Sequence, residues 1–261
     1  MSNKESVILQ NLSIGYTHKS QQRVVASELN ATIYSGQLTC LLGRNGVGKS
    51  TLLRTLAAFL PPLAGDILIQ NDSLAALTDK AISRLIGIVL TERPHVRNMS
   101  VIEMVAMGRA PYTGFWGKLE DDDKEVVQQA IRQTGIETLK HRQIQTLSDG
   151  ERQKVMIAKA LAQQTPIIYL DEPTAFLDFP SKVEAMQLLH RLATEEEKTI
   201  FLSTHDVELA LQLADCIWLM EDDGLHVGTP HELATQGVLQ RFIERPGIHF
   251  DNQTLTVHVT P

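Results

Sequence analysis

Residues 38–59 constrain the fold more than any other segment of the chain. The apolar run LTCLLG at 38–43 leads directly into a glycine-rich loop at 43–51, and the loop leads into STLLRTLAAFL, which suits a helix. Glycines let the backbone of such a loop turn so that successive N–H groups face one side. A strand, a tight loop and a helix in this order are a building block of α/β folds.

The rest of the chain repeats this alternation. Several of the apolar runs contain no polar residue, which is typical of strands buried on both faces of a parallel sheet. We therefore predict an α/β fold. From 92 to 160 the pattern is helix and loop without a clear strand, which indicates an inserted helical subdomain. Strands are expected at 7–9, 38–43, 67–70, 86–90, 166–170, 199–203 and 216–220, and helices at 49–59, 78–85, 100–108, 122–134, 151–163, 181–197 and 206–214.

Composition excludes several classes of protein. With 24 basic and 31 acidic side chains the formal net charge is −7, which argues against sequence-independent binding to nucleic acid. The two cysteines, Cys40 and Cys216, stand in apolar runs without a CxxC pair, so we expect two buried thiols and no zinc or iron–sulfur site. We find no run long enough to span a bilayer and no signal-peptide pattern, and expect a cytoplasmic protein that reaches a membrane only through a partner.

The glycine-rich loop carries the sharpest motif. It reads Gly43-Arg44-Asn45-Gly46-Val47-Gly48-Lys49-Ser50-Thr51 and matches G-x-x-x-x-G-K-[ST] between a strand and a helix. The loop amides and the helix N-terminus would bind phosphate oxygens. Lys49 would bind the β- and γ-phosphates, and the Ser50 hydroxyl would ligate Mg²⁺.

A second segment, PIIYLDE at 166–172, is an apolar strand that ends in two acids. Burying carboxylates is costly unless they are paired or lie near a metal ion, so the end of this strand is expected to be functional. Asp171 would hold Mg²⁺ directly or through water. Glu172 would polarise the water that attacks the nucleotide.

The stretch LSDGERQ at 147–153 resembles the signature sequence of ABC-type ATPases, usually written LSGGQ. The phosphate loop, this stretch and the Asp171–Glu172 pair stand in the order of that family, and the resemblance covers about residues 5–235. It implies the P-loop NTPase core of the ABC ATPase type, a small N-terminal antiparallel β region, and ATP with Mg²⁺ as ligands. The implied division is a nucleotide-binding core at 1–91 and 161–235, a helical subdomain at 92–160 and a C-terminal extension at 236–261.

The resemblance also implies roles for single residues. Ser148 and Gly150 would reach the ATP of a second copy in a head-to-tail homodimer, and Ser148 with Glu151 has the spacing of a capping box as well. Asp178, in AFLD, resembles the aspartate that communicates across the dimer. Tyr16 resembles the aromatic residue that stacks on adenine, although it can also be an ordinary tyrosine at the end of a strand. His205 resembles the switch histidine that contacts the γ-phosphate.

Two positions depart from the pattern. Where the family carries a glutamine that ligates Mg²⁺, this chain has Thr91, followed by Glu92. A hydroxyl or a carboxylate can take that place, but neither has the reach of glutamine, so altered metal coordination is expected at Thr91. Asp149 stands where the family usually has glycine. Because a carboxylate would repel γ-phosphate, its side chain is expected to point away or to cap the helix.

Within the family, the segment MSVIEMVAMGRAPY at 99–112 resembles the ATPase subunits of importers for iron–siderophore, haem or cobalamin. The resemblance implies permease subunits that dock near 93–116, a substrate-binding protein that acts indirectly, and a peripheral place on the cytoplasmic face of the membrane. The aromatic residues Tyr112, Phe115 and Trp116 are either interface anchors or the core of a small subdomain.

Two alternatives remain open from the sequence. One is a soluble ABC ATPase, for example of the type that serves iron–sulfur assembly. The other is a regulatory module that binds nucleotide without turnover, which the changes at Thr91 and Asp149 would allow. The C-terminal stretch GIHFDNQTLTVHVTP alternates apolar and polar residues, which favours an edge strand or a hairpin.

Overall fold

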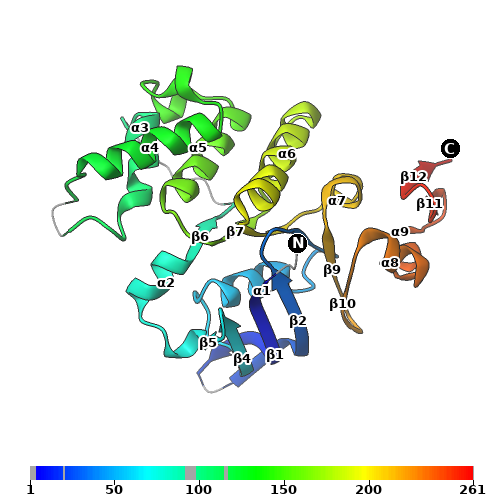
Figure 1. The fold of residues 1–261 in the computed structure, drawn as a ribbon. Helices are drawn as coiled ribbons and strands as arrows, with labels where there is room; N and C mark the ends of the chain where they lie inside the picture. Colours follow the sequence, from blue (N-terminus) through cyan, green and yellow to red (C-terminus); the bar gives the residue numbers. More distant parts are fainter. Residues whose placement is uncertain (1–3, 20, 92–97, 115–116, 261) are drawn as a thin grey trace. The chain divides into compact units, whose positions relative to one another are not determined.

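The computed structural model describes residues 4–19, 21–91, 98–114 and 117–260. The chain forms two compact units (Figure 1). The first unit comprises Met1–Ala76 and Leu189–Pro261, and the second comprises Leu77–Leu188. Helix α6 (Phe179–Glu196) runs through the boundary between these ranges.

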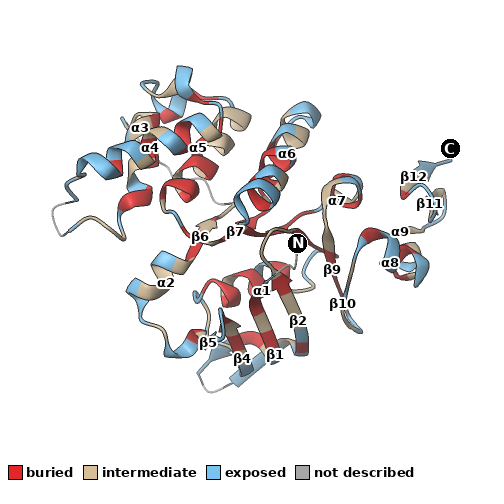
Figure 2. Ribbon diagram, in the orientation of Figure 1, coloured by how far each residue is buried: buried red, intermediate tan, exposed pale blue. Residues whose placement is uncertain are grey.

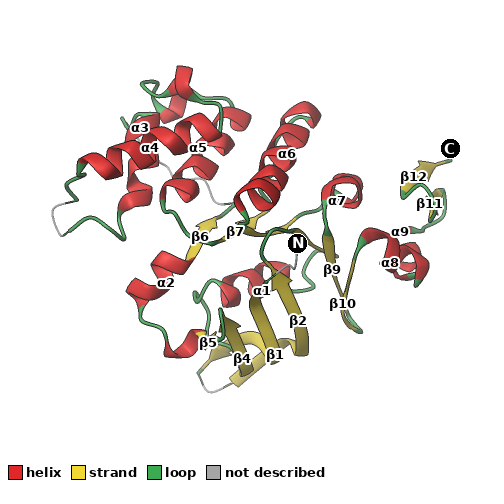
Figure 3. Ribbon diagram, in the orientation of Figure 1, coloured by secondary structure: helices red, strands yellow, loops and turns green. Residues whose placement is uncertain are grey.

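An antiparallel sheet with the strand order β2-β1-β4-β5 begins the first unit (Figure 3). Its strands are β1 (Glu5–His18), β2 (Gln21–Tyr34), β4 (Ala64–Ile69) and β5 (Asp72–Ser73). Apolar side chains alternate along β1, and its register shifts where Asn11 adopts a φ of 46°. The buried members of this face are Val7, Leu9, Leu12 and Ile14. The small antiparallel region expected near the N-terminus is confirmed.

A second group of strands in the first unit is parallel. Strand β3 (Leu38–Gly43) pairs with β8 (Thr199–Ser203) on one side and β9 (Cys216–Glu221) on the other. Every residue of β3 and β8 is buried, as expected for strands covered on both faces. Buried residues also run along β1 of the antiparallel sheet (Figure 2). Strand β10 (Gly224–Gly228) pairs antiparallel with β9. The ring of Phe201 packs edge-on against Trp218, with the ring centroids 5.0 Å apart.

Short helices complete the first unit. Helix α1 (Lys49–Leu56) follows the glycine-rich loop, and α7 (Val207–Leu213) follows β8. A 3-10 turn, η1 (Leu74–Ala76), follows β5. Beyond β10 come α8 (Pro230–Thr235), α9 (Val238–Ile243) and a hairpin of β11 (Ile248–Asp251) with β12 (Thr256–Val259). Of the edge strand and the hairpin that the sequence leaves open here, the structure has the hairpin.

The second unit contains two parallel strands, β6 (Ile86–Val89) and β7 (Ile167–Asp171), and a set of helices. The helices are α2 (Asp79–Leu85), α3 (Val101–Ala106), α4 (Asp121–Gln133) and α5 (Asp149–Ala162). Helices α3, α4 and α5 pack against one another (Figure 1). Three 3-10 turns connect them: η2 (Met107–Arg109), η3 (Glu137–Leu139) and η4 (Ile144–Thr146).

The predicted strands and helices all occur, and most ends differ by a few residues, but the strand expected at 7–9 extends over Glu5–His18. Between 98 and 160 the described residues form helices and turns, with one isolated bridge between Ser100 and Gln143. The division at 91, 160 and 235 stays a prediction. Among the described residues, we find no helix whose length and apolar character would let it cross a membrane.

Candidate active site

The glycine-rich loop of the first unit needs glycine at two positions. Gly43 has a φ of 152°, and a Cβ atom there would lie 2.5 Å from the main-chain oxygen of Met220. Gly48 has a φ of 122°, and a Cβ atom there would lie 2.5 Å from Cγ1 of Val25. Gly46 also has a positive φ, 81°, but open space around it. Steric demands therefore hold the loop in a turned backbone, with Arg44, Asn45 and Gly46 exposed.

The helix after the loop presents a lysine and a hydroxyl. Lys49 is buried, and its Nζ donates to the main-chain oxygens of Gly43 at 2.9 Å and Arg44 at 3.2 Å. Ser50 is exposed in the first turn of α1. That turn contains no acidic residue, so the positive end of the helix dipole is not neutralised by its own side chains. The loop and the helix start are thus suited to an anion such as a phosphate chain.

Tyr16 lies on β1 of the same unit with 43% of its surface exposed. Its hydroxyl shares a hydrogen bond of 2.9 Å with Oγ1 of Thr51, which is buried in α1. The bond ties the ring to the helix that follows the phosphate loop. An exposed aromatic ring fixed in this way can stack on a purine base.

His205 follows β8 and is exposed. Because β3 and β8 are parallel, His205 and the phosphate loop both follow the carboxyl ends of neighbouring strands. The junction is held by Thr204, whose N–H donates to the oxygen of Leu41 at 3.1 Å. Ligands bind at such strand ends in open α/β sheets. The geometry of the first unit is therefore compatible with the expected place of His205 near a phosphate.

In the second unit, Asp171 ends the buried strand β7 and is itself buried. Glu172 follows with a φ of 50°, an uncommon backbone conformation for a residue other than glycine. The hydroxyl of Thr91 donates to the main-chain oxygen of Asp171 at 2.7 Å. This bond uses the only proton of the hydroxyl and leaves its oxygen as an acceptor or ligand. The expected role of Thr91 in metal binding stays a prediction, and Glu92 lies outside the described residues.

The signature stretch forms the start of α5. Ser148 is the N-cap, and its Oγ accepts from the N–H of Glu151 at 3.2 Å while the Glu151 carboxylate accepts from the Ser148 N–H at 2.8 Å. The predicted capping box is confirmed, and the Ser148 N–H bond lowers the pKa of Glu151. Asp149 begins the helix and does not cap it. A Cβ atom at Gly150 would lie 2.9 Å from Oγ of Ser181, so glycine allows close packing against the start of α6.

Asp178 precedes α6 and is exposed. Its Oδ1 accepts from the N–H of Ser181 at 3.1 Å, and bonds from Ser181 lower the pKa of Asp178. The aspartate is therefore charged at neutral pH and is held at the beginning of the helix.

Comparison with known proteins agrees with this set of elements. Residues 26–175 match the family described as ABC transporter. The chain belongs to the ABC transporter family. The petrobactin import ATP-binding protein FpuD of Bacillus anthracis is 37% identical over 220 residues, which are 84% of this chain and 81% of that protein.

Two solved structures are informative. An ABC transporter assigned to the metal-chelate type, in an inward-facing conformation, has a TM-score of 0.80 and 25% identity, covering 99% of this chain and 98% of its own. The second is the ATP-binding cassette MJ0796, a dimer in a post-hydrolysis state bound to ADP and Pi. It has a TM-score of 0.73 and 26% identity, and the match covers 86% of this chain and 98% of the MJ0796 chain. This ABC protein is thus a nucleotide-binding cassette and an ATPase.

The segment that resembles importer ATPases is built around Arg109 in this ABC protein. Arg109 is buried and contacts Asp123 of α4, with Nε and Oδ1 2.9 Å apart. The ring of Tyr112 lies close to two guanidinium groups, with Cζ of Arg109 4.0 Å and Cζ of Arg84 5.0 Å from its centroid. Tyr112 therefore packs within the second unit. Phe115 and Trp116 lie outside the described residues.

A small cavity in the second unit of the ABC protein brings residues that the sequence analysis selected together with others that it did not select, among them Arg152 and Gln153. The cavity has a volume of about 30 Å³. Its lining combines polar residues from three segments, namely Thr91, Asp149, Arg152, Gln153 and Glu172, with apolar ones that include Met156 and Phe176. The signature helix and the segment after β7 thus share one cavity. These lining residues are far apart in the sequence, so the sequence alone does not predict that they share a cavity.

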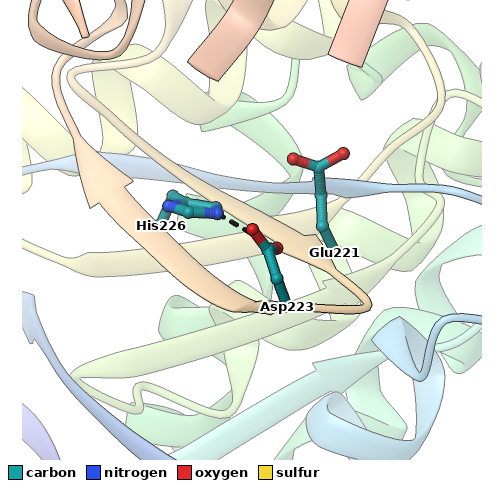
Figure 4. A group of neighbouring side chains, drawn as sticks. All are labelled: Glu221, Asp223 and His226. Carbon is teal, nitrogen blue, oxygen red and sulfur yellow. Dashed lines mark hydrogen bonds and ion pairs between the residues drawn. The ribbon is translucent and has the colours of Figure 1, made fainter. Parts of the chain in front are cut away.

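A second group that the sequence analysis did not select lies on the β9–β10 hairpin of the first unit (Figure 4). Glu221, Asp223 and His226 place one ligand-type atom each within 4.8 Å of the others. Asp223 is exposed, and its Oδ1 lies 3.3 Å from Nε2 of His226. We interpret the group as a surface hydrogen bond between Asp223 and His226 with a neighbouring glutamate.

Proposed function

We propose that the chain is the ATP-hydrolysing subunit of a membrane importer for an iron complex (a siderophore or haem) or for cobalamin. The observation that carries the proposal is the occurrence, in an ABC protein, of an importer-type segment at 99–112. The petrobactin import relative and the metal-chelate type transporter support the same cargo class.

In this proposal the first unit binds the phosphates of ATP. The amides of loop 43–51 and the start of α1 face the phosphate oxygens. Lys49 leaves its two carbonyl partners, 2.9 and 3.2 Å away, for the β- and γ-phosphates. Tyr16 stacks on adenine, and His205 contacts the γ-phosphate.

Magnesium fits the residues that the sequence selects for it. Ser50 and Thr91 offer hydroxyl oxygens and Asp171 offers a buried carboxylate, and oxygen donors of this kind are what Mg²⁺ prefers. Bound Mg²⁺ would neutralise part of the charge of the transferred phosphoryl group.

Hydrolysis itself is assigned to Glu172, which orients or deprotonates the attacking water. Glu172 has a left-handed backbone conformation, and its main-chain oxygen accepts a hydrogen bond of 3.0 Å from the N–H of Ala175. Such a conformation is fixed by its surroundings, which suits a group that must be held in place. Ser148, Gly150 and Asp178 act across a homodimer, on the ATP bound by the other copy.

The homodimer would drive transport by closing on ATP and opening after hydrolysis. Permease subunits dock near 93–116, on the cytoplasmic face of the membrane, and a substrate-binding protein delivers the cargo to the permease from the other side. The dimeric MJ0796 cassette supports the pairing of two copies.

Replacing Glu172 by Gln tests the chemistry. We expect Glu172→Gln to bind ATP normally, to lose turnover by at least about a hundredfold and to accumulate as a closed dimer with ATP. Glu195→Gln, an exposed change on α6, is the matched control and should keep wild-type turnover. Turnover of Glu172→Gln near the wild-type rate would remove Glu172 from the mechanism.

Affinity purification of the tagged chain from gently solubilised native membranes tests the transport role. We expect a permease with several membrane spans to copurify, and that permease with its binding protein would narrow the cargo. Recovery of soluble partners alone, with no chain in the membrane fraction, would contradict the importer and favour a soluble ABC ATPase.

A further inference from the structure

Helix α5 connects the signature serine to the surroundings of Glu172. Ser148 caps the helix, and Arg152 and Gln153 lie one turn further along it. Arg152 and Gln153 line the cavity of about 30 Å³ that Glu172 also lines. A water molecule needs about 10–15 Å³ of such space and two to four polar partners. The cavity is therefore large enough and polar enough to hold ordered water.

Two hydrogen-bond donors on this lining lack a partner. Nε of Arg152 and Nε2 of Gln153 are buried, and neither has a hydrogen-bond partner among the described residues. Another part of the Arg152 guanidinium is engaged, because Nη2 donates to the oxygen of Leu147 at 3.4 Å. A buried donor without an acceptor costs free energy. These two N–H groups are therefore poised for an acceptor in the cavity.

The acceptors come from the residues that share the cavity. Thr91 can accept, because its proton is donated to the Asp171 oxygen. Asp149 stands three and four residues before Arg152 and Gln153, so it lies on the same side of α5. Glu172 brings a carboxylate from another segment. Hydrogen bonds from a guanidinium or an amide to a carboxylate are among the stronger ones in proteins.

We propose that Gln153 and Arg152 are positioning residues that hold the Glu172 carboxylate, directly or through one water, in the orientation that hydrolysis requires. The inference rests on the proposed role of Glu172 as the base. It gives α5 a second task beyond the cap at Ser148. A movement of α5 at its N-cap would then change the hydrogen bonds that orient the Glu172 carboxylate in the same subunit.

A double-mutant cycle tests this role on the full-length chain, with single-turnover hydrolysis of bound Mg-ATP as the readout. Gln153→Leu removes the amide at similar volume. We expect it to slow hydrolysis about tenfold while ATP affinity stays within about twofold. Added to Glu172→Gln, it should change the remaining rate by less than about twofold, because the group it positions is already gone. Gln129→Leu, an exposed change on α4, is the matched control.

A rescue separates positioning from mere packing. Thr91 lines the same cavity, so a longer amide side chain from Thr91→Gln can reach the space that Gln153→Leu vacates. We expect the double variant to recover at least about half of the rate that Gln153→Leu loses, measured against Thr91→Gln alone so that any effect of this change on Mg²⁺ binding cancels. If Gln153→Leu melts more than about 5 °C below the wild type, Gln153→Met, which keeps the side-chain length, takes its place.

Three outcomes overturn the proposal. The first is hydrolysis by Gln153→Leu within twofold of the wild type. The second is an equal loss from Gln153→Leu with and without Glu172→Gln, which would place its effect elsewhere. The third is wild-type hydrolysis by Glu172→Gln alone, which would remove the proposed base itself and is visible before any change at Gln153 is made.

Discussion

Nε of Arg109 lies 2.9 Å from Oδ1 of Asp123 in the interior of the second unit, where their side chains are only 7% and 12% exposed. The same guanidinium donates from Nη1 to the oxygen of Ala162 at 2.9 Å and to Oε1 of Gln164 at 2.8 Å. One side chain thus joins η2, the first turn of α4 and the end of α5. The importer-type segment owes its position to this connection.

Removing Arg109 should destabilise the protein strongly. Arg109→Met leaves Asp123 buried without its partner, and losing one member of a buried ion pair costs about 3–5 kcal/mol. Lys124→Met, which removes an exposed pair with Asp121, is the control and should leave the unfolding midpoint unchanged. Urea unfolding followed by helical circular dichroism measures both. Equal midpoints for Arg109→Met and the wild type would show that the connection carries no stability.

Acid should unfold the protein below about pH 4, the ordinary range of carboxyl groups. Bonds from Arg109 lower the pKa of Asp123, and backbone N–H groups at helix caps lower those of Glu151 and Glu232. Because these folded-state pKa values lie below the unfolded ones, their stabilisation is present above the unfolded pKa and is lost as pH falls through the folded pKa. Melting temperatures at pH 7, 5, 4 and 3 measure the effect. Between pH 5 and 3, the melting temperature of Asp123→Asn should fall by less than that of the wild type. An equal fall would contradict the contribution of Asp123 to the loss of stability in acid.

The sequence predicts most elements of the fold because their signals are local. Strand β6 (IGIV) is apolar throughout and β3 (LTCLLG) nearly so, and several helices begin at a polar cap such as Thr78 or Ser148. Strand β2 escaped individual prediction for a physical reason. It lies at the edge of its sheet, and only Leu29 and Ile33 of its 14 residues are buried, so it shows no clear alternation.

The candidate site likewise has parts that the sequence predicts and parts that depend on contacts between distant segments. The phosphate loop, the Asp171–Glu172 pair and the signature are contiguous motifs that a sequence displays directly. Gln153, Thr91 and Glu172 line one cavity although they come from three separate segments, and their spacing in the sequence does not predict this cavity. The bond from Thr91 to the Asp171 oxygen likewise depends on the parallel pairing of β6 with β7.

Two glycines of the phosphate loop should differ in their tolerance of alanine. At Gly43 the new methyl group would meet a main-chain oxygen 2.5 Å away, which cannot move without the strand, so we expect a loss of about 2–4 kcal/mol. At Gly46 the space is open and only the positive φ is strained, so the expected loss is about 1–2 kcal/mol. Urea midpoints of Gly43→Ala and Gly46→Ala measure the difference. A larger loss at Gly46 would contradict the packing around Gly43.

Tyr16 allows stacking and hydrogen bonding to be separated. Its ring is exposed, whereas its hydroxyl is bonded to Thr51 at 2.9 Å. Tyr16→Phe keeps the ring and should leave ATP affinity within about twofold, because the lost bond is internal to the protein. Tyr16→Ala removes the ring, and since stacking of a base on an aromatic side chain contributes about 1–3 kcal/mol, ATP should bind about 5- to 100-fold more weakly. Isothermal titration with ATP measures both variants. The stacking role predicts that triphosphate without a base binds Tyr16→Ala and the wild type equally, and equal weakening for triphosphate and ATP would instead assign Tyr16 to the support of α1.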